Sequence, residues 1–318
     1  MAINQIQFQK GMSLSEFMAR YGSEAQCQSA LFAWRWAEGF RCPACSCEAH
    51  RTFERAHHRL WQCAECGRQT SVTAGTVMAH SKLPLRTWFL AIYLVTQSKN
   101  GISALELKRH LGVRYPTAWL MHHKLLRAMA TAEAPRRLGG RVEIDDAYLG
   151  GERTGGKPGR GSENKVPFVA AVKTYEGKPI VVRFDPVPDF TSASLTAWAK
   201  KALRADADVV SDGLKSFAAV LSVGRSHAPI VAGPGKKGAQ HASFKWVNTL
   251  LGNLKTSLAG TYHAFGFRQY AHRYLAAAAW RFNRRTDMAA MIRDLATTLM
   301  AVTPCAARGL RCSAEAHG

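Results

Sequence analysis

The segment VEIDDAYLGG, residues 142–151, decides which fold we expect for this chain. Its first four residues alternate between apolar and acidic side chains, which is the pattern of a β-strand with one buried face. The fourth, Asp145, and its neighbour Asp146 are the first aspartates of the chain. The glycine pair that closes the segment is typical of a turn. We therefore expect a strand that carries carboxylates to its end, where they can serve as oxygen ligands for a divalent cation.

The sequence after this segment predicts a mixed α/β domain. The expected elements are strand, strand, helix, strand, helix and helix, over residues 166–174, 179–184, 192–203, 209–213, 242–258 and 267–284. Three strands followed by helix, strand and helix is the order of a ribonuclease-H-like fold, a mixed sheet flanked by helices. In that fold Asp145 and Asp212 end neighbouring strands and form a clamp for two Mg²⁺ ions. The alternative is that Asp212 only caps the helix expected from Leu214.

Two C-x-x-C pairs precede this domain: Cys42 with Cys45, and Cys63 with Cys66. Short strands are expected between the pairs, so each pair lies on its own turn. Four thiolates brought together in this way match tetrahedral Zn²⁺, whose bonds to sulfur are about 2.3 Å long. We therefore predict a zinc ribbon with one structural Zn²⁺; the alternatives are redox pairs or unrelated buried cysteines. Four residues between the pairs are alternative ligands whose spacing fits a knuckle less well: Cys47, His50, His57 and His58.

Between the ribbon and the acidic strand the sequence predicts three helices. Lys82–Leu85 opens the first, Ser103-x-x-Glu106 caps the second, and Pro116 stands near the start of the third, after a break at Gly112. Helix, glycine turn and helix is the arrangement of a DNA-binding helix-turn-helix; the alternative is a three-helix packing module. The side chains expected to contact DNA are Arg114, Tyr115, Thr117 and Lys124.

The charge balance favours a polyanionic partner. Lys and Arg number 43 against 22 Asp and Glu, which gives a net charge of +21, and no acidic residue lies between Asp212 and Asp287. Such a field attracts nucleic acid and speeds association with it. The basic loop over 155–165 is either a clamp on the phosphate backbone or a solvated turn; its cations are Lys157, Arg160 and Lys165.

Membrane and secreted proteins are the classes that the composition disfavours. No stretch approaches the ~20 apolar residues of a membrane span. The first residues, with Gln5, Gln7 and Gln9, carry no apolar signal region. We therefore expect a cytoplasmic protein that does not contact a membrane.

Several motifs, in order along the chain, resemble those of bacterial insertion-sequence transposases with a zinc ribbon and an integrase-like catalytic domain. The segments that carry the resemblance are EIDDAYLGG (143–151), SDGLKSF (211–217), WVNTLLGNLK (246–255), GTYH (260–263), RYL (273–275) and RFNRR (281–285). The ribbon and the segments at 81–85 and 101–104 fit as well. The resemblance covers roughly residues 13–286. Within this range several independent motifs agree, in the same order along the chain.

The resemblance implies metal-dependent DNA transposition, in which the ends of the element are cleaved and the freed 3′-hydroxyl attacks target DNA. By position, Asp145 and Asp212 are metal ligands, and the resemblance selects Asp145 over Asp146, a choice that strand alternation leaves open. The third ligand position holds Asn248, where many relatives have glutamate. An asparagine oxygen completes a coordination shell without adding charge. Two catalytic Mg²⁺ or Mn²⁺ ions are expected.

Asn248 and Lys255 stand two turns apart on one stripe of the helix expected over 242–258. The neighbouring apolar face of that helix is expected to dock on the sheet; it consists of Val247, Leu250, Leu251, Leu254 and Leu258. Spacing alone leaves open a solvated surface helix, whereas the resemblance places Asn248 at the metal site and Lys255 over a phosphate near the scissile bond. Three nearby acids are expected to lie outside the catalytic set and to serve as controls: Glu143, Asp146 and Asp185.

The sequence predicts five parts. They are N-terminal helices (1–37), a zinc ribbon (38–80), a helix-turn-helix-like module (81–134), a ribonuclease-H-like catalytic domain (138–286), and a C-terminal helix and tail (287–318). The expected partner is double-stranded DNA, as terminal inverted repeats and as target, bound by a homo-oligomer on synapsed ends in a bacterial nucleoid. The alternatives are a catalytically inactive or domesticated sequence-specific DNA-binding protein and, third, a ribonuclease or junction nuclease on the same fold.

Overall fold

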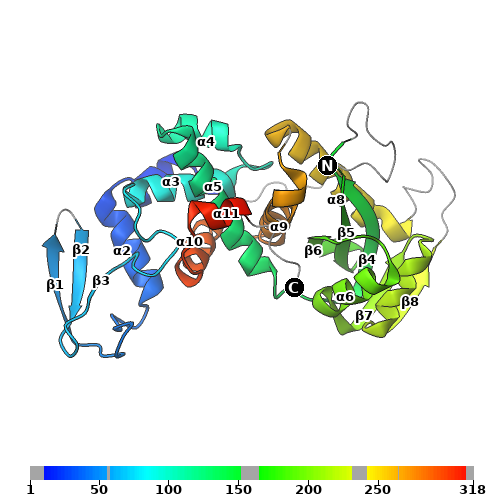
Figure 1. Ribbon diagram of the computed structural model, residues 1–318, viewed down its shortest axis with the longest axis horizontal. Helices are drawn as coiled ribbons and strands as arrows, with labels where there is room; N and C mark the ends of the chain where they lie inside the picture. The colour runs from blue at the N-terminus through cyan, green and yellow to red at the C-terminus, as the bar shows by residue number, and fades with distance from the viewer. Residues whose placement is uncertain (1–10, 56–57, 152–164, 231–241, 264, 313–318) are drawn as a thin grey trace. The chain divides into compact units, whose positions relative to one another are not determined.

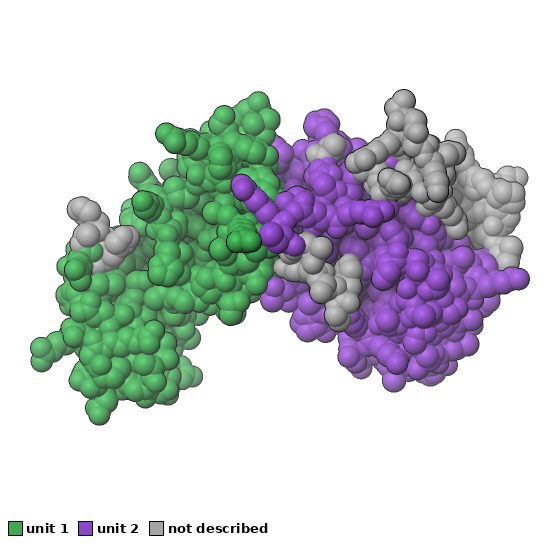
Figure 2. All heavy atoms as spheres, in the orientation of Figure 1, with its two compact units in different colours: residues 1–99, 104–128, 287–310 green, residues 100–103, 129–286, 311–318 purple. Residues whose placement is uncertain are grey.

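The computed structural model describes residues 11–55, 58–151, 165–230, 242–263 and 265–312. The chain divides into two compact units (Figure 2). Unit 1 comprises residues 1–99, 104–128 and 287–310, and unit 2 comprises residues 100–103, 129–286 and 311–318. Within the described ranges, no helix is long and apolar enough to cross a lipid bilayer.

Unit 1 begins with two short helices and a small sheet. Helices α1 (Leu14–Tyr21) and α2 (Glu24–Arg35) each start at a serine whose side chain and backbone form a capping box with the residue three positions on. The antiparallel sheet that follows has the strand order β1-β2-β3. Its strands are β1 (His50–Arg55), β2 (His58–Cys63) and β3 (Gln69–Ser71). This is the sheet of the predicted ribbon.

Further helices complete the described part of unit 1. They are α3 (Leu85–Gln97), α4 (Ala104–Leu111), α5 (Tyr115–Glu133, whose last turn belongs to unit 2), α10 (Met291–Ala301) and α11 (Ala307–Cys312). Helix α10 packs against α2 and α3, and Leu295 is fully buried, like Phe89 of α3. The Val77 N–H donates to the Leu299 carbonyl at 3.2 Å. The chain after residue 286 therefore returns to the core of unit 1.

Unit 2 is built on a five-stranded sheet with the order β6-β5-β4-β7-β8 (Figure 1). The strands are β4 (Leu138–Leu149), β5 (Val166–Tyr175), β6 (Lys178–Pro186), β7 (Leu203–Ser211) and β8 (Ser226–Pro229). β5 is antiparallel to both β4 and β6, whereas β4, β7 and β8 are mutually parallel. This mixed sheet with flanking helices is the predicted ribonuclease-H-like fold.

The two faces of the sheet carry different helices. Val142 and Ile144 of β4 face a core formed with α6 (Ser192–Ala202) and the 3₁₀ helix η2 (Lys215–Ser222). Side chains alternate along a strand, so Glu143 and Asp145 point to the other face. There α8 (Lys245–Tyr262), which follows the short η3 (Ala242–Phe244), packs on β4 and β5. α9 (Phe267–Asn283) packs mainly on β6 (Figure 1).

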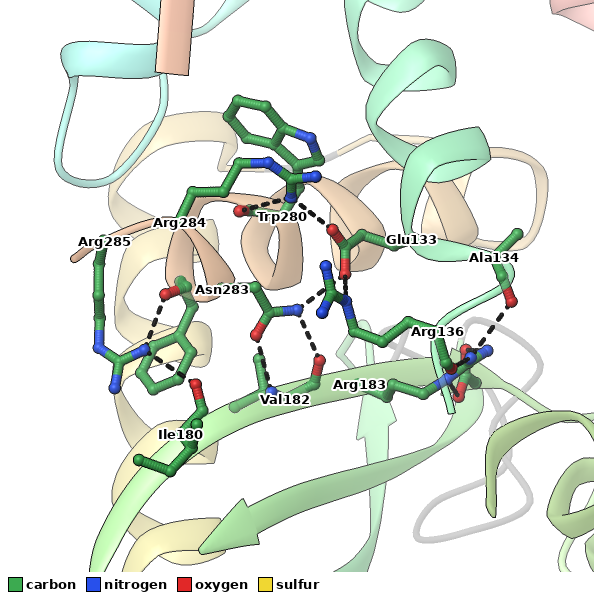
Figure 3. Close-up of polar contacts among 12 residues, drawn as sticks. Glu133, Ala134, Arg136, Ile180, Val182, Arg183, Trp280, Asn283, Arg284 and Arg285 are labelled. Carbon is green, nitrogen blue, oxygen red and sulfur yellow. Dashed lines mark hydrogen bonds and ion pairs between the residues drawn. The ribbon is translucent and has the colours of Figure 1, made fainter. Parts of the chain in front are cut away.

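A buried glutamate at the end of α5 holds the end of α9, and Asn283 at that end of α9 bonds the edge strand β6 (Figure 3). Glu133 is 6 % exposed and accepts hydrogen bonds from Arg136 Nε at 2.7 Å, Asn283 Nδ2 at 2.8 Å and Arg284 Nη1 at 2.6 Å. The Asn283 side chain also bonds the Val182 backbone, accepting from its N–H at 2.8 Å and donating to its carbonyl at 3.0 Å. Three donors satisfy the buried carboxylate, as burial of a charge requires.

Candidate metal centres

The four cysteines of the two C-x-x-C pairs lie together at the tips of two turns. Their Sγ atoms are 3.6 Å apart for Cys42 and Cys66, 3.5 Å for Cys45 and Cys63, and 3.5 Å for Cys45 and Cys66. Four sulfurs at about 2.3 Å from one Zn²⁺ lie about 3.8 Å from each other, along the edges of a tetrahedron. A disulfide needs about 2.05 Å instead. The donor set and its spacing therefore fit one closed, structural zinc site.

Both turns are built in the same way. Four residues after the first cysteine, a backbone N–H donates to that cysteine's carbonyl: Ser46 to Cys42 at 2.9 Å and Gly67 to Cys63 at 3.1 Å. Ser46 and Gly67 have φ values of 62° and 69°, a left-handed conformation that suits glycine and strains serine. The Cys66 backbone N–H points at the Cys63 sulfur and lowers the pKa of that thiol to about 6. A thiolate that forms this readily suits metal binding.

The alternative zinc ligands have other partners where the structure describes them. The Cys47 thiol points at the Ala49 carbonyl, 3.8 Å away, and His50 Nδ1 lies 2.8 Å from the Glu48 carbonyl. His57 and the side chain of His58 lie outside the described part of the chain. The cysteine cluster thus consists of the residues that the spacing selects.

A second cluster joins three carboxylates, Asp145, Asp146 and Asp212, each of which offers an oxygen within 4.8 Å of the others. Strand register explains the meeting, because β4 and β7 are parallel and Ile144 pairs with Ser211. The residues that follow this pair, Asp145 and Asp212, therefore emerge side by side. Sequence reasoning joined the same two residues and placed Asp146 among the controls; the structure brings it into the cluster.

The Asp145 carboxyl is strongly perturbed. Burial, and then the negative charges of Asp212 and Asp146, raise its pKa from 3.8 to about 7, while Lys255 acts in the opposite direction. Carboxylates that repel one another in a low-dielectric site favour a bound cation, which removes the repulsion. The donor chemistry fits Mg²⁺ or Mn²⁺, which take carboxylate oxygens.

Asp212 also caps the turn that follows it, which was the alternative interpretation of this residue. Its Oδ1 accepts a hydrogen bond from the Leu214 N–H at 3.1 Å, which fixes the turn after β7. The preceding Ser211 is fully buried, and its hydroxyl lies 2.8 Å from His227 Nε2 on β8. These contacts hold the carboxylate in place without removing it from the cluster, so capping and metal binding are compatible here.

Helix α8 carries the remaining two candidates. Its buried face is the predicted one and consists of Val247, Leu250, Leu251, Leu254 and Leu258. Asn248 is half-buried in the first turn, and Lys255 is exposed two turns later. The effect of Lys255 on the Asp145 pKa shows that its ammonium acts on the carboxylate cluster.

Sequence reasoning missed Glu143, which it treated as a control. This side chain is 2 % exposed, and its Oε2 accepts hydrogen bonds from the backbone N–H groups of Trp246 and Val247, both at 3.0 Å. Asp185 is equally unsuited as a control, because its carboxylate binds Arg183 at 2.8 and 2.9 Å and Trp198 Nε1 at 2.9 Å. The partners of Glu143, and Trp198 beside Asp185, lie on other elements, so no local signal points to these contacts; Arg183 alone stands two residues from Asp185 on the same strand.

The predicted DNA-contacting residues divide into two groups. Arg114 and Tyr115 are exposed at the turn between α4 and α5, and Thr117 is half-buried beside them. Lys124 points inward instead: its Nζ donates to the Val77 carbonyl at 2.9 Å, lies 5.6 Å from the centre of the Trp88 ring, and has its pKa lowered by burial. These contacts give the Lys124 ammonium a structural role within unit 1. Of the basic loop, Lys157 and Arg160 lie outside the described residues, and Lys165 precedes β5.

Comparison with known proteins agrees with this geometry. A family model of the ISXO2-like transposase domain matches residues 137–283, and a model of the transposase zinc-ribbon domain matches residues 22–69. Over 213 residues the chain is 29 % identical to an uncharacterized protein in transposable element ISH50 of Halobacterium salinarum, a match that covers 61 % of this chain and 69 % of that protein. The chain therefore carries a transposase zinc-ribbon domain ahead of an ISXO2-like transposase domain.

Proposed function

We propose that this transposase cleaves the ends of its own element and joins the freed 3′-hydroxyl to target DNA. The observation that carries the proposal is the cluster of Asp145, Asp146 and Asp212 on a ribonuclease-H-like sheet. Asp145, Asp212 and the amide oxygen of Asn248 would hold two Mg²⁺ or Mn²⁺ ions, with Asp146 beside them. When bound, such ions polarise the phosphodiester and stabilise the attacking and leaving oxygens.

The side chains have separate tasks in this proposal. The carboxylates of Asp145 and Asp212 bind and orient cations, and Asn248 adds a neutral oxygen. Lys255, exposed on α8, places its ammonium over a phosphate near the scissile bond. Because Asn248 supplies no charge where many relatives have glutamate, Asp145 and Asp212 supply all the negative charge of these three ligands, −2 against the +4 of two cations.

DNA recognition is assigned to unit 1 and to the basic loop. The zinc ribbon and the α4–α5 pair, with Arg114, Tyr115 and Thr117, would bind the terminal inverted repeats. Lys124 is left out, because it bonds the Val77 carbonyl. In the basic loop, Lys157, Arg160 and Lys165 would contact phosphates. We further propose a homo-oligomer on two synapsed ends, acting on DNA in the cytoplasm.

The test compares Asp145→Asn and Asp212→Asn with wild type on DNA that contains an end of the element. Both variants should lose cleavage and joining in Mg²⁺ or Mn²⁺ while the affinity for the end stays within about twofold, because phosphate contacts come from other surfaces. Asp206→Asn is the matched control, since that carboxylate is half-exposed and pairs with Arg204 at 3.0 Å. Cleavage by either active-site variant at the wild-type rate would refute the assignment.

Asn248 favours one second candidate, a transposase descendant that binds DNA without cutting it. That protein would shift end-containing DNA in a gel and leave it intact at every Mn²⁺ concentration. A wild-type chain that behaves in this way supports the second candidate, and cleavage by wild type excludes it.

A further inference from the structure

The N-terminus of α8 is capped from a distant part of the chain. Its N-cap residue is Phe244, whose side chain cannot accept a hydrogen bond. Glu143 takes this role from 103 residues away in sequence: its Oε2 receives the N–H groups of Trp246 and Val247, both at 3.0 Å. These are two of the first-turn amides that a helix leaves without an intrahelical acceptor. A carboxylate there also complements the positive end of the helix dipole.

A second hydrogen bond fastens the same turn of α8. The Trp246 indole Nε1 donates to the Gly177 carbonyl at 2.7 Å, in the turn between β5 and β6. The first turn of α8 is thus bonded both to the central strand β4 and to the β5–β6 turn. We call this pair of contacts, made by Glu143 and Gly177 to the start of α8, the α8 latch.

Packing alone does not hold this end of the helix. A cavity of about 400 Å³ lies beside the latch and is bordered by Glu143, Thr174, Lys245 and Trp246. The apolar face of α8 contributes one fully buried side chain to the first turn, Val247, and continues with leucines in the later turns. Beside the cavity, directional hydrogen bonds to buried groups add to that packing in setting the position of the backbone. The latch is therefore a constraint on the first turn in addition to the packing of Val247.

We propose that Glu143 is a positioning residue that sets where Asn248 and Lys255 stand relative to the carboxylate cluster, an inference that rests on the function proposed above. Glu143 and Asp145 are two residues apart on one face of β4, so the same strand carries a metal ligand and the anchor of α8. Asn248 follows the anchored Val247 directly. Loss of the anchor would let the first turn of α8 move while the aspartates remain in place. Misplacement of a catalytic group by about 1 Å costs up to 10²-fold in rate.

The experiment compares three variants of the full-length chain. Glu143→Ala removes the acceptor and leaves two buried N–H groups without it, whereas Glu143→Gln retains a side-chain oxygen of the same reach. Glu133→Ala is the matched control: it removes the other buried glutamate of unit 2, whose partners are Arg136, Asn283 and Arg284 (Figure 3). The measurements are the cleavage rate at saturating DNA end, the affinity for that end, and amide hydrogen exchange over residues 245–250.

We expect Glu143→Ala to cleave about 10- to 100-fold more slowly, with unchanged affinity for the end and faster exchange over 245–250. Glu143→Gln should recover most of the rate. Glu133→Ala should lower the unfolding midpoint at least as much as Glu143→Ala and, assayed below that midpoint, keep a near-wild-type rate. Equal rate losses in Glu143→Ala and Glu133→Ala, or no recovery by Gln, would overturn the positioning role.

The exchange measurement separates this inference from the proposed function. If the wild-type chain does not cleave DNA, the function fails, and the latch is still judged by exchange. Exchange over 245–250 that is the same in Glu143→Ala and wild type would refute the latch, even if the wild type cleaves.

Discussion

We predict that Asp145 carries a proton at pH 6 in the protein without a divalent cation, and that Mn²⁺ displaces this proton when it binds. Burial and the charges of Asp212 and Asp146 raise its pKa to about 7. A group with that pKa is about ten-elevenths protonated at pH 6 and about one-eleventh at pH 8. The binding-competent carboxylate is therefore mostly present at pH 8, half present at pH 7 and mostly lost at pH 6. Mn²⁺ affinity should be about tenfold weaker at pH 6 than at pH 8.

Titration calorimetry on zinc-loaded protein tests this value. Mn²⁺ binding at pH 6, in two buffers with different heats of ionisation, should release about one proton, and at pH 8 almost none. Asp145→Asn should bind Mn²⁺ more weakly and lose the pH dependence, because the titrating group is gone. Equal wild-type affinity at the two pH values, without proton release, would show that Asp145 is ionised throughout and would refute the argument from burial and repulsion.

Three further predictions concern zinc, DNA contacts and the third ligand. Cys63→Ser should lose the bound zinc and weaken end binding, while circular dichroism still shows a folded unit 2; full zinc content would refute the cysteine site. End affinity should fall with a slope of about −0.9 in log K against log salt for each phosphate contact, and Arg114→Ala should reduce the slope by about one such step. Lys124→Ala should leave the slope unchanged and lower the unfolding midpoint, because its ammonium bonds the Val77 carbonyl. Asn248→Ala should slow cleavage more than it weakens DNA binding, whereas Asn248→Asp should retain cleavage; wild-type rates in the alanine variant would exclude Asn248 from the site.

Local patterns predicted the elements that bury one face. Alternation over 142–145 marked the central strand, and the apolar stripe from Val247 to Leu258 marked the docked face of α8, both as the structure has them. The C-x-x-C spacing predicted a cluster of four cysteines. In the structure, the Sγ atoms of three of their pairs lie within 3.6 Å of each other. These features depend on periods and spacings of a few residues, which a single sequence displays.

Contacts between distant segments were not predictable in this way. In the sequence, Glu143 looks like any other polar residue of an alternating strand. Its role as acceptor for the Trp246 N–H depends on where α8 begins, 103 residues later. Lys124 has helical neighbours that fit a recognition helix, and only the position of Val77 shows that it points inward. Asp145 and Asp146 both lie within β4, which continues to Leu149, and both stand just past Ile144 and Ser211, where the pairing of β4 with β7 ends. Asp146 therefore joins the cluster although it follows Asp145 directly on the strand.

The strand order of unit 2 also determines when in folding the metal site comes into existence. β4 pairs antiparallel with β5, and β5 with β6, over short stretches of chain, whereas the parallel partner of β4, β7, arrives only after α6. Long-range parallel pairing is slow, because loop closure precedes any gain from contacts. A chain emerging from the ribosome therefore displays Asp145 and Asp146 well before Asp212 joins them, and α8 comes later still. Incomplete chains lack part of the proposed ligand set, so the proposed metal centre cannot assemble before nearly the whole domain has been synthesised.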